Sequence, residues 1–268
     1  MTEADRIQAR RALPPMAEIA PSRATIAARF VRTRLFDLCI FVWSLLFGIA
    51  IMTYFKIQCR PREVRWILWL WTNGFIRAAR AICGVRYRVE GLETVPDRPV
   101  VFVANHHSYW ESIALCAFLP NVNVVTKRAS MSIPVFGWGL RCAPMIPVDR
   151  DRPGQNLRRI VRQAKRSLAE GRSVLIFPEG QRVSAWERCR FQRGLELIYG
   201  ELGSEVVPIV HNAGLLWPRG FGVKRPGLIT MRFLPVEPAG EPPEAFVARL
   251  EALLNAEKDR LLTAEHAG

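Results

Sequence analysis

The N-terminal third of the chain contains one long apolar segment followed by an amphipathic one. Residues 35–55 carry a single charge, Asp37, and their number reaches the roughly 20 that a helix needs to cross a bilayer. Residues 66–82 begin with three tryptophans and end in arginines, a pattern typical of a helix that lies among lipid head groups. The pattern predicts a membrane-associated helical pair over residues 35–83.

The residues on either side of the apolar segment do not determine how it would lie in a membrane. Residues 1–34 are polar, basic and interrupted by prolines, so we expect a partly disordered arm. Basic residues follow the apolar segment as well as precede it, and the positive-inside rule therefore does not distinguish a single span from a hairpin that enters one leaflet. The tryptophan-rich segment also fits a core helix of the domain that follows.

From Gly84 onward, short apolar runs alternate with helical patterns. The expected strands are residues 87–90, 100–104, 122–126, 145–148, 173–177, 206–210 and 228–234. The expected helices are residues 110–118, 155–170 and 191–202, with a last amphipathic helix near the C-terminus. This alternation predicts an α/β fold in residues 84–268, with a mostly parallel central sheet flanked by helices.

Charge and cysteine content narrow the class of partner. The 268 residues carry a formal charge of +14, which favours anionic partners such as nucleic acid, phospholipid head groups or phosphorylated substrates. Nucleic acid is not expected as a partner, because the basic residues are not interleaved with aromatic residues that could stack on bases. A nucleic-acid-binding protein would also have no need of the apolar segment at residues 35–55. The six cysteines are scattered without a C-x-x-C pair, which indicates buried thiols in a reducing compartment.

The stretch "VVFVANHHSYWES" contains two of the four histidines in the chain. His106 follows an expected strand, and Glu111 begins the next helix. A carboxylate there can accept a hydrogen bond from one imidazole nitrogen and leave the other as a base for a substrate hydroxyl. The spacing alone fits an ordinary loop histidine equally well, and His107 is the alternative base. A metal site is not expected, because no third ligand stands near the two histidines.

Further strands also end in polar residues. In "VLIFPEGQR", Glu179 and Gly180 form a turn in which glycine permits close approach of a ligand, and Arg182 offers a planar fork suited to phosphate. Lys127 and Arg150 follow two other strands. Because ligands bind at the carboxyl ends of parallel strands, we expect these residues to gather at one edge of the sheet with His106.

Four blocks in order, "NHHSYWE", "KRASMSIPVFGWGLRCAPMIPVDR", "FPEGQR" and "VVPIVHNAG", resemble the glycerolipid acyltransferase family that makes phosphatidic acid. The resemblance covers residues 84–238. It implies transfer of a fatty acyl group from acyl-CoA or acyl-carrier protein to the free hydroxyl of 1-acylglycerol 3-phosphate. It implies no metal, no cofactor and no covalent acyl-enzyme.

The resemblance also assigns roles to residues. It implies His106 as the general base and Glu111 as the carboxylate that orients it. Glu179 and Gly180 match the turn that shapes the acceptor site. Arg150 and Arg182 match positions linked to the acceptor phosphate, and Lys127 adds positive charge nearby.

The family setting implies a membrane phospholipid surface as partner, and we expect a bacterial inner-membrane enzyme with its active site facing the cytoplasm. Two departures keep the acceptor open: Glu111 stands where Asp is commoner, and Gln181 replaces the usual Thr. A different lysolipid, such as lyso-ornithine lipid, is therefore the alternative acceptor. A non-catalytic membrane adaptor is a further hypothesis, against which the His106 and Glu111 pair argues.

Overall fold

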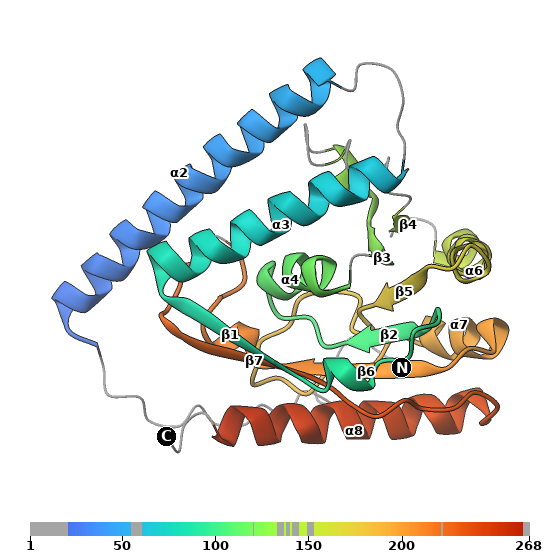
Figure 1. Cartoon of the computed structure of the whole chain (residues 1–268). Helices are drawn as coiled ribbons and strands as arrows, with labels where there is room; N and C mark the ends of the chain where they lie inside the picture. Colours follow the sequence, from blue (N-terminus) through green and yellow to red (C-terminus); the bar gives the residue numbers. More distant parts are fainter. Residues whose placement is uncertain are drawn as a thin grey trace.

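The computed structural model describes residues 21–54, 61–119, 121–132, 137, 140, 145–148, 153–220 and 222–264. It opens with two long helices, α2 (Arg23–Tyr54) and α3 (Pro61–Cys83), which run antiparallel along one side of the molecule (Figure 1). The helix α2 begins well inside the segment that we expected to be a partly disordered arm. The hydroxyl of Ser22 accepts a hydrogen bond from the N–H of Thr25 at 3.1 Å, which caps this early start.

The remaining elements alternate as the sequence predicts. They are β1 (Val85–Glu90), β2 (Val101–Ala104), α4 (Trp110–Phe118), β3 (Val122–Lys127), β4 (Ile146–Val148), α6 (Pro153–Ala169), β5 (Ser173–Ile176), α7 (Gly194–Leu202), β6 (Val206–His211), β7 (Gly227–Phe233) and α8 (Pro243–Ala264). Short 3₁₀ turns lie at η1 (Leu92–Thr94), η2 (Arg128–Ser132) and η3 (Ala213–Leu215).

The strands form one seven-stranded sheet in the order β1-β7-β6-β2-β5-β3-β4. From β6 to β4 all neighbours are parallel, whereas β7 pairs antiparallel with β6 and β1 follows the direction of β7. The prediction of an α/β fold with a mostly parallel sheet flanked by helices is confirmed. In this topology β2, β5, β3 and β4 end at the same edge, which is where the candidate residues were expected.

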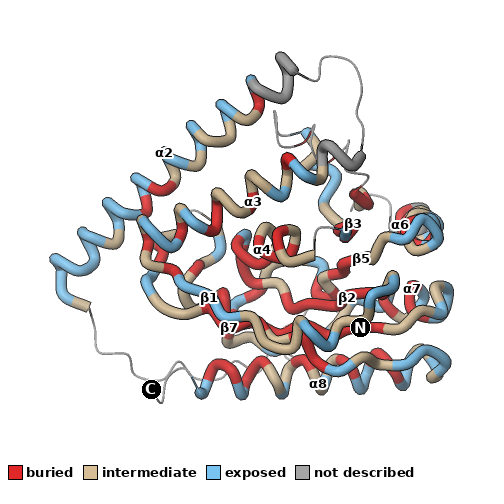
Figure 2. Tube along the Cα trace, viewed as in Figure 1, coloured by how far each residue is buried: buried red, intermediate tan, exposed pale blue. Residues whose placement is uncertain are grey.

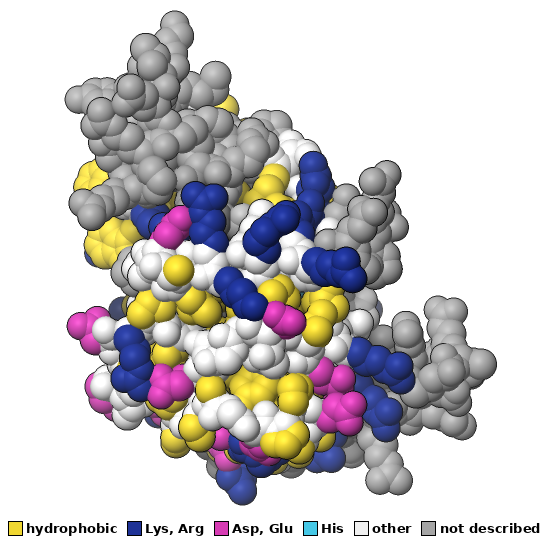
Figure 3. Space-filling view, turned by 90° about the vertical axis from the view of Figure 1, so that its right-hand side faces the viewer, with side chains coloured by type: hydrophobic (Ala, Val, Ile, Leu, Met, Phe, Trp, Pro, Cys, Tyr) yellow, Lys and Arg dark blue, Asp and Glu magenta, His cyan; other side chains and the backbone are white. Residues whose placement is uncertain are grey.

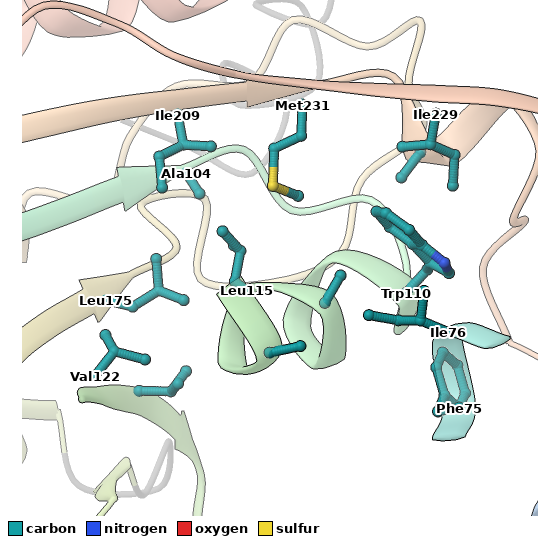
Figure 4. Packing of buried hydrophobic residues seen from close by; sticks show 14 of the residues in the cluster. Phe75, Ile76, Ala104, Trp110, Leu115, Val122, Leu175, Ile209, Ile229 and Met231 are labelled. Carbon is teal, nitrogen blue, oxygen red and sulfur yellow. The ribbon is translucent and has the colours of Figure 1, made fainter. Parts of the chain in front are cut away.

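Helices cover both faces of the sheet, and the central strands are therefore buried on both sides (Figure 2). Along β2, Phe102 and Ala104 belong to the core beneath α3 and α4, whereas Val101 and Val103 pack against α6, α7 and α8. This burial explains why the strand is a continuous apolar run. Figure 4 shows the first of these cores, where Trp110 of α4 approaches the sheet.

The helix α2 is fastened to the domain by its N-terminal half. Phe36 is buried and meets the rings of Phe75 and Trp217 edge-on at centroid distances of 5.4 and 5.3 Å. Asp37 pairs with the buried Lys224 at 2.8 Å, so the single charge in the apolar segment has a structural partner. The first part of this segment is thus a docking element of the domain.

The outward face of α2 and the start of α3 expose large apolar side chains. They are Ile26, Phe30, Val31, Leu35, Leu38, Phe41, Val42, Leu45, Leu46 and Ile49 on α2, and Trp66 and Trp69 on α3. Within the described part of the chain, no helix combines the length and the apolar composition that crossing a membrane requires. The membrane association of the pair stays a prediction.

Basic side chains gather on a different side of the molecule. Figure 3 shows this side, where Lys and Arg residues lie over α6. The exposed positions on that helix include Arg158, Arg162, Lys165 and Arg166, while Ile160 and Ala164 on its other face are buried. Part of the net positive charge is therefore the solvated face of an amphipathic helix rather than part of the site.

Candidate active site

His106 and Glu111 form the hydrogen bond that their spacing predicts. The loop after β2 turns directly into α4, which places Glu111 in the first turn of that helix. Its Oε1 lies 3.0 Å from Nδ1 of His106. The imidazole stacks on the ring of Phe177 with a centroid distance of 4.2 Å, and its side chain is 19% exposed. The ring is thus fixed in orientation while one edge stays open to a cavity.

Glu111 is fully buried and richly hydrogen-bonded. Its Oε1 also accepts the backbone N–H groups of His107, at 2.8 Å, and Ser108, at 2.6 Å, and the Ser108 hydroxyl donates to Oε2. Burial raises the pKa of this carboxyl, but the hydrogen bond from His106 and the neighbouring imidazoles outweigh burial and lower it to about 2. Glu111 is therefore an anion at neutral pH, suited to stabilise a protonated His106.

The other two buried histidines belong to a scaffold beneath this pair. The Asn105 side chain exchanges two hydrogen bonds of 3.0 Å with the backbone of His211, and Nε2–H of His211 donates to the Asn105 carbonyl at 2.6 Å. Asn105 Nδ2 also donates to the ring of His107 at 3.1 Å. Burial, together with the nearby His211, lowers the pKa of His107 well below its usual value. His107 is 1% exposed, and of these two neighbouring histidines it is His106 that lines the apolar cavity.

Glu179 lies in the turn after β5 and holds the backbone of His106. Its Oε1 accepts the His106 N–H at 3.2 Å, and the N–H of Val183 donates to the His106 carbonyl at 2.9 Å. Burial raises the pKa of Glu179 to about 7, and its Oε2 has no hydrogen-bond partner. Gly180 has φ of 68°, a conformation that a side chain would strain. The turn therefore depends on glycine at this position.

Of the three basic residues predicted to bind or lie near the acceptor phosphate, the structure describes two. Arg182 lies over the ring of Tyr109, with 3.9 Å from Cζ to the ring centroid, and its Nη1 is buried without a hydrogen-bond partner. Lys127 ends β3 and lines the same cavity as His106 and Arg182. Arg150 lies outside the described residues. The structure thus brings together all the predicted site residues that it describes.

A largely apolar cavity of about 490 Å³ extends from His106 between α3, α4 and β3. Its apolar walls include Leu68, Trp71, Ile113, Cys116, Val122 and Val124. The polar side chains of His106, Lys127, Arg182 and Arg219 line it too. Sequence reasoning missed Tyr109, Trp71 and Arg219 as site residues. The aromatic residue inside the first motif was a usable signal for Tyr109, whereas the other two depend on tertiary packing.

A family model described as Acyltransferase matches residues 86–212, from β1 to just past β6. A 1-acyl-sn-glycerol-3-phosphate acyltransferase of Pseudomonas aeruginosa is 36% identical over 221 residues, which cover 80% of this chain and 84% of that protein. The chain belongs to this acyltransferase family. The His106 and Glu111 pair and the Glu179 turn of this acyltransferase lie within the matched region, whereas Arg219 and α8 lie beyond it.

One solved structure and one further relative are also similar to this acyltransferase. The crystal structure of the 1-acyl-sn-glycerophosphate (LPA) acyltransferase PlsC from Thermotoga maritima matches with a TM-score of 0.70 at 20% identity, covering 87% of this chain and 97% of that one, which supports the fold. A lyso-ornithine lipid O-acyltransferase of Rhizobium meliloti is 33% identical over 124 residues, 46% of this chain and 39% of that protein.

Proposed function

We propose that this acyltransferase moves a fatty acyl group from acyl-CoA or acyl-carrier protein to the free hydroxyl of 1-acylglycerol 3-phosphate, forming phosphatidic acid. The observation that carries the proposal is the 3.0 Å hydrogen bond between Nδ1 of His106 and buried Glu111, beside an apolar cavity. The name of the Pseudomonas relative supports this acceptor. The donor supplies an activated thioester and the acceptor supplies the attacking hydroxyl, so the proposed reaction uses no metal and no cofactor.

The proposed chemistry is a direct acyl transfer. The Nε2 atom of His106 takes the proton of the acceptor hydroxyl as its oxygen attacks the thioester carbonyl carbon. Glu111 retains its hydrogen bond to Nδ1–H and stabilises the imidazolium that forms. Collapse of the tetrahedral intermediate forms the ester, breaks the C–S bond and returns the proton from His106 to the leaving thiolate. Because the thioester is already activated, positioning of the two substrates supplies much of the acceleration.

The proposed substrate arrangement follows from the polarity of the walls. The apolar part of the 490 Å³ cavity takes acyl chain, where its methylenes leave water. Arg182 and Lys127 supply positive charge for the acceptor phosphate, with Arg150 as a further ligand. Glu179 and Gly180 shape the acceptor side, where the raised pKa of Glu179 lets its carboxyl donate or accept a hydrogen bond near pH 7.

We further propose that the exposed apolar face of α2 and the tryptophans of α3 lie in the membrane interface. Trp66 is 61% exposed, while Trp71 on the same helix lines the cavity. A lysophospholipid resides in that interface, so α3 would join the lipid surface to the site. The proposed location is the bacterial inner membrane with the site facing the cytoplasm, which agrees with free thiols at Cys39, Cys83, Cys116 and Cys189.

A second acceptor has a specific observation in its favour. The Rhizobium lyso-ornithine lipid O-acyltransferase is 33% identical, although over less than half of this chain. Lyso-ornithine lipid carries no phosphate monoester, so its binding would depend less on Arg182.

The experiment that tests the function is acyl transfer by detergent-solubilised protein, with labelled acyl-CoA or acyl-carrier protein as donor. The acceptor panel contains 1-acylglycerol 3-phosphate, lyso-ornithine lipid and a neutral lysolipid. We expect phosphatidic acid as the preferred product. Product from lyso-ornithine lipid alone would reassign the acceptor, and the absence of any product would support the adaptor hypothesis instead.

A further inference from the structure

A second cavity, of about 400 Å³, lies beside the apolar one. The two cavities share Gln181, Arg182 and Arg219 as lining residues. The second cavity is bounded further by His107 and by Gly214, where a side-chain Cβ would come within 2.8 Å of the Cβ of His107. Glycine at this position therefore lets the segment after β6 approach the catalytic loop closely enough to form the wall of a small chamber.

The shared boundary of the two cavities contains an unused hydrogen-bond donor. Nη1 of Arg182 is buried and has no partner, which is costly for a guanidinium unless a ligand supplies an oxygen. The Tyr109 ring beneath Arg182, at 3.9 Å, fixes the plane of the guanidinium. The donor is thus held in place before any ligand arrives.

Arg219 is the second cation at this boundary. Its side chain is exposed, and no ion pair involves it within the described residues. Ser184 and Gln181 add polar groups to the second cavity, and among the described residues that line it only Glu187 is acidic. Two arginines against one carboxylate leave a site that favours an anion of more than one charge.

We propose that Arg219 joins Arg182 in binding the phosphate monoester of the acceptor, with the second cavity as the subsite for its polar head. This inference rests on the proposed function and names the group that selects the acceptor. A phosphate monoester carries a charge of about −1.5 to −2 near neutral pH, so two cations match it better than one. With the phosphate at the shared boundary, the glycerol backbone extends into the first cavity, where His106 lies.

The test is the steady-state kinetics of Arg219→Gln in the full chain. We expect the KM for 1-acylglycerol 3-phosphate to rise about tenfold or more, while kcat changes less than about threefold and the KM for the acyl donor stays the same. Arg219→Lys should recover part of the loss. The matched control is Arg190→Gln, which removes an exposed arginine that lines neither cavity.

A second variant tests the cavity itself. Ser184→Trp places bulk in the second cavity and should also raise the acceptor KM, with an unfolding temperature close to wild type because Ser184 is exposed. sn-Glycerol 3-phosphate, as a soluble probe, should compete with the acceptor for wild type and much less for Arg219→Gln.

The outcomes separate this inference from the function. An active wild type with an unchanged acceptor KM in Arg219→Gln would overturn the subsite alone. A rise in the donor KM instead would assign the subsite to the donor's phosphates and overturn it as well. Wild-type protein that makes no phosphatidic acid would overturn the proposed function and this inference together.

Discussion

Two buried glutamates contact His106, and their environments give them opposite properties. Glu111 bonds the imidazole ring and has a pKa of about 2, whereas Glu179 bonds the His106 backbone N–H and has a pKa of about 7. Both are fully or almost fully buried, so burial alone does not explain the difference. Both oxygens of Glu111 accept hydrogen bonds, whereas Oε2 of Glu179 accepts none.

The difference shows how two segments around His106, the start of α4 and the turn after β5, hold carboxyl groups with different properties. In the proposed mechanism, Glu111 must remain charged to stabilise a transient imidazolium. The hydrogen bond from His106 and the neighbouring imidazoles lower its pKa to about 2, and three donors from residues 107 and 108 hold the carboxylate in place. Glu179, which we propose to lie on the acceptor side, has an Oε2 atom without a hydrogen-bond partner, and its charge changes near pH 7. The hydrogen-bonding capacity of the Glu111 carboxylate is thus used within the protein. Glu179 and Arg182, in contrast, each have a buried polar atom without a partner, which is available for a ligand.

The largest effect is expected from the same substitution at both glutamates. Glu111→Gln should lower kcat about 100-fold or more, because a neutral amide cannot stabilise the imidazolium, with little change in acceptor KM. Glu179→Gln should lower kcat much less below pH 7, where the wild-type carboxyl is already neutral. Steady-state rates of acyl transfer at saturating concentrations of both substrates measure the two losses of kcat. Equal losses would contradict the division of tasks.

The two glutamates should also change the pH dependence of stability in opposite directions. Glu179 has a folded pKa of about 7, above its usual 4.5, so the folded state binds its proton more tightly. Its contribution to stability is complete below pH 4.5 and is lost as the pH rises through 7. Glu111, with a folded pKa of about 2, contributes stability above pH 4.5 that is lost as the pH falls toward 2.

Denaturant unfolding of Glu179→Gln against wild type measures the first of these effects. The variant should lack the decline in unfolding free energy that wild type shows between pH 5 and 8, and the two curves should differ most above pH 7. Parallel curves across this range would show that Glu179 does not titrate there.

A buried charge that lines neither cavity provides a smaller, structural reference. Lys224→Met removes the buried partner of Asp37 and should lower the unfolding free energy by about 1–3 kcal/mol, while kcat of the folded protein is unchanged. Lys165→Met is the matched control, because its pair with Glu201 has a similar 2.7 Å distance but is half exposed. The control should cost clearly less than Lys224→Met, because solvent screens an exposed pair. A matching loss in both variants would show that burial of the Lys224 pair adds nothing.

The predictable parts of this molecule were those with local signals. The sheet followed from apolar runs, because strands buried on both faces need no polar alternation. The His106 and Glu111 contact spans five residues, so the turn into a helix nearly determines it. Glu179 and Arg182 were expected at the same edge because parallel strands end together.

The parts that escaped prediction depend on distant segments. Asp37 finds its partner Lys224 across 187 residues, and no local pattern joins them. Arg219 enters the site only because β6 and the turn after it pack beside the Arg182 loop. The start of α2 was missed for a different reason: prolines and arginines indicated an arm, although arginine and alanine favour helix once Ser22 caps it.

The most direct test of the catalytic role of His106 is single-turnover acyl transfer by His106→Ala with saturating donor and 1-acylglycerol 3-phosphate. If Nε2 of His106 is the base, the rate should fall by at least about 1,000-fold while the protein remains folded and still binds anionic lipid vesicles. A variant that retains more than about a tenth of the wild-type rate would contradict that role and assign the proton transfer to another group.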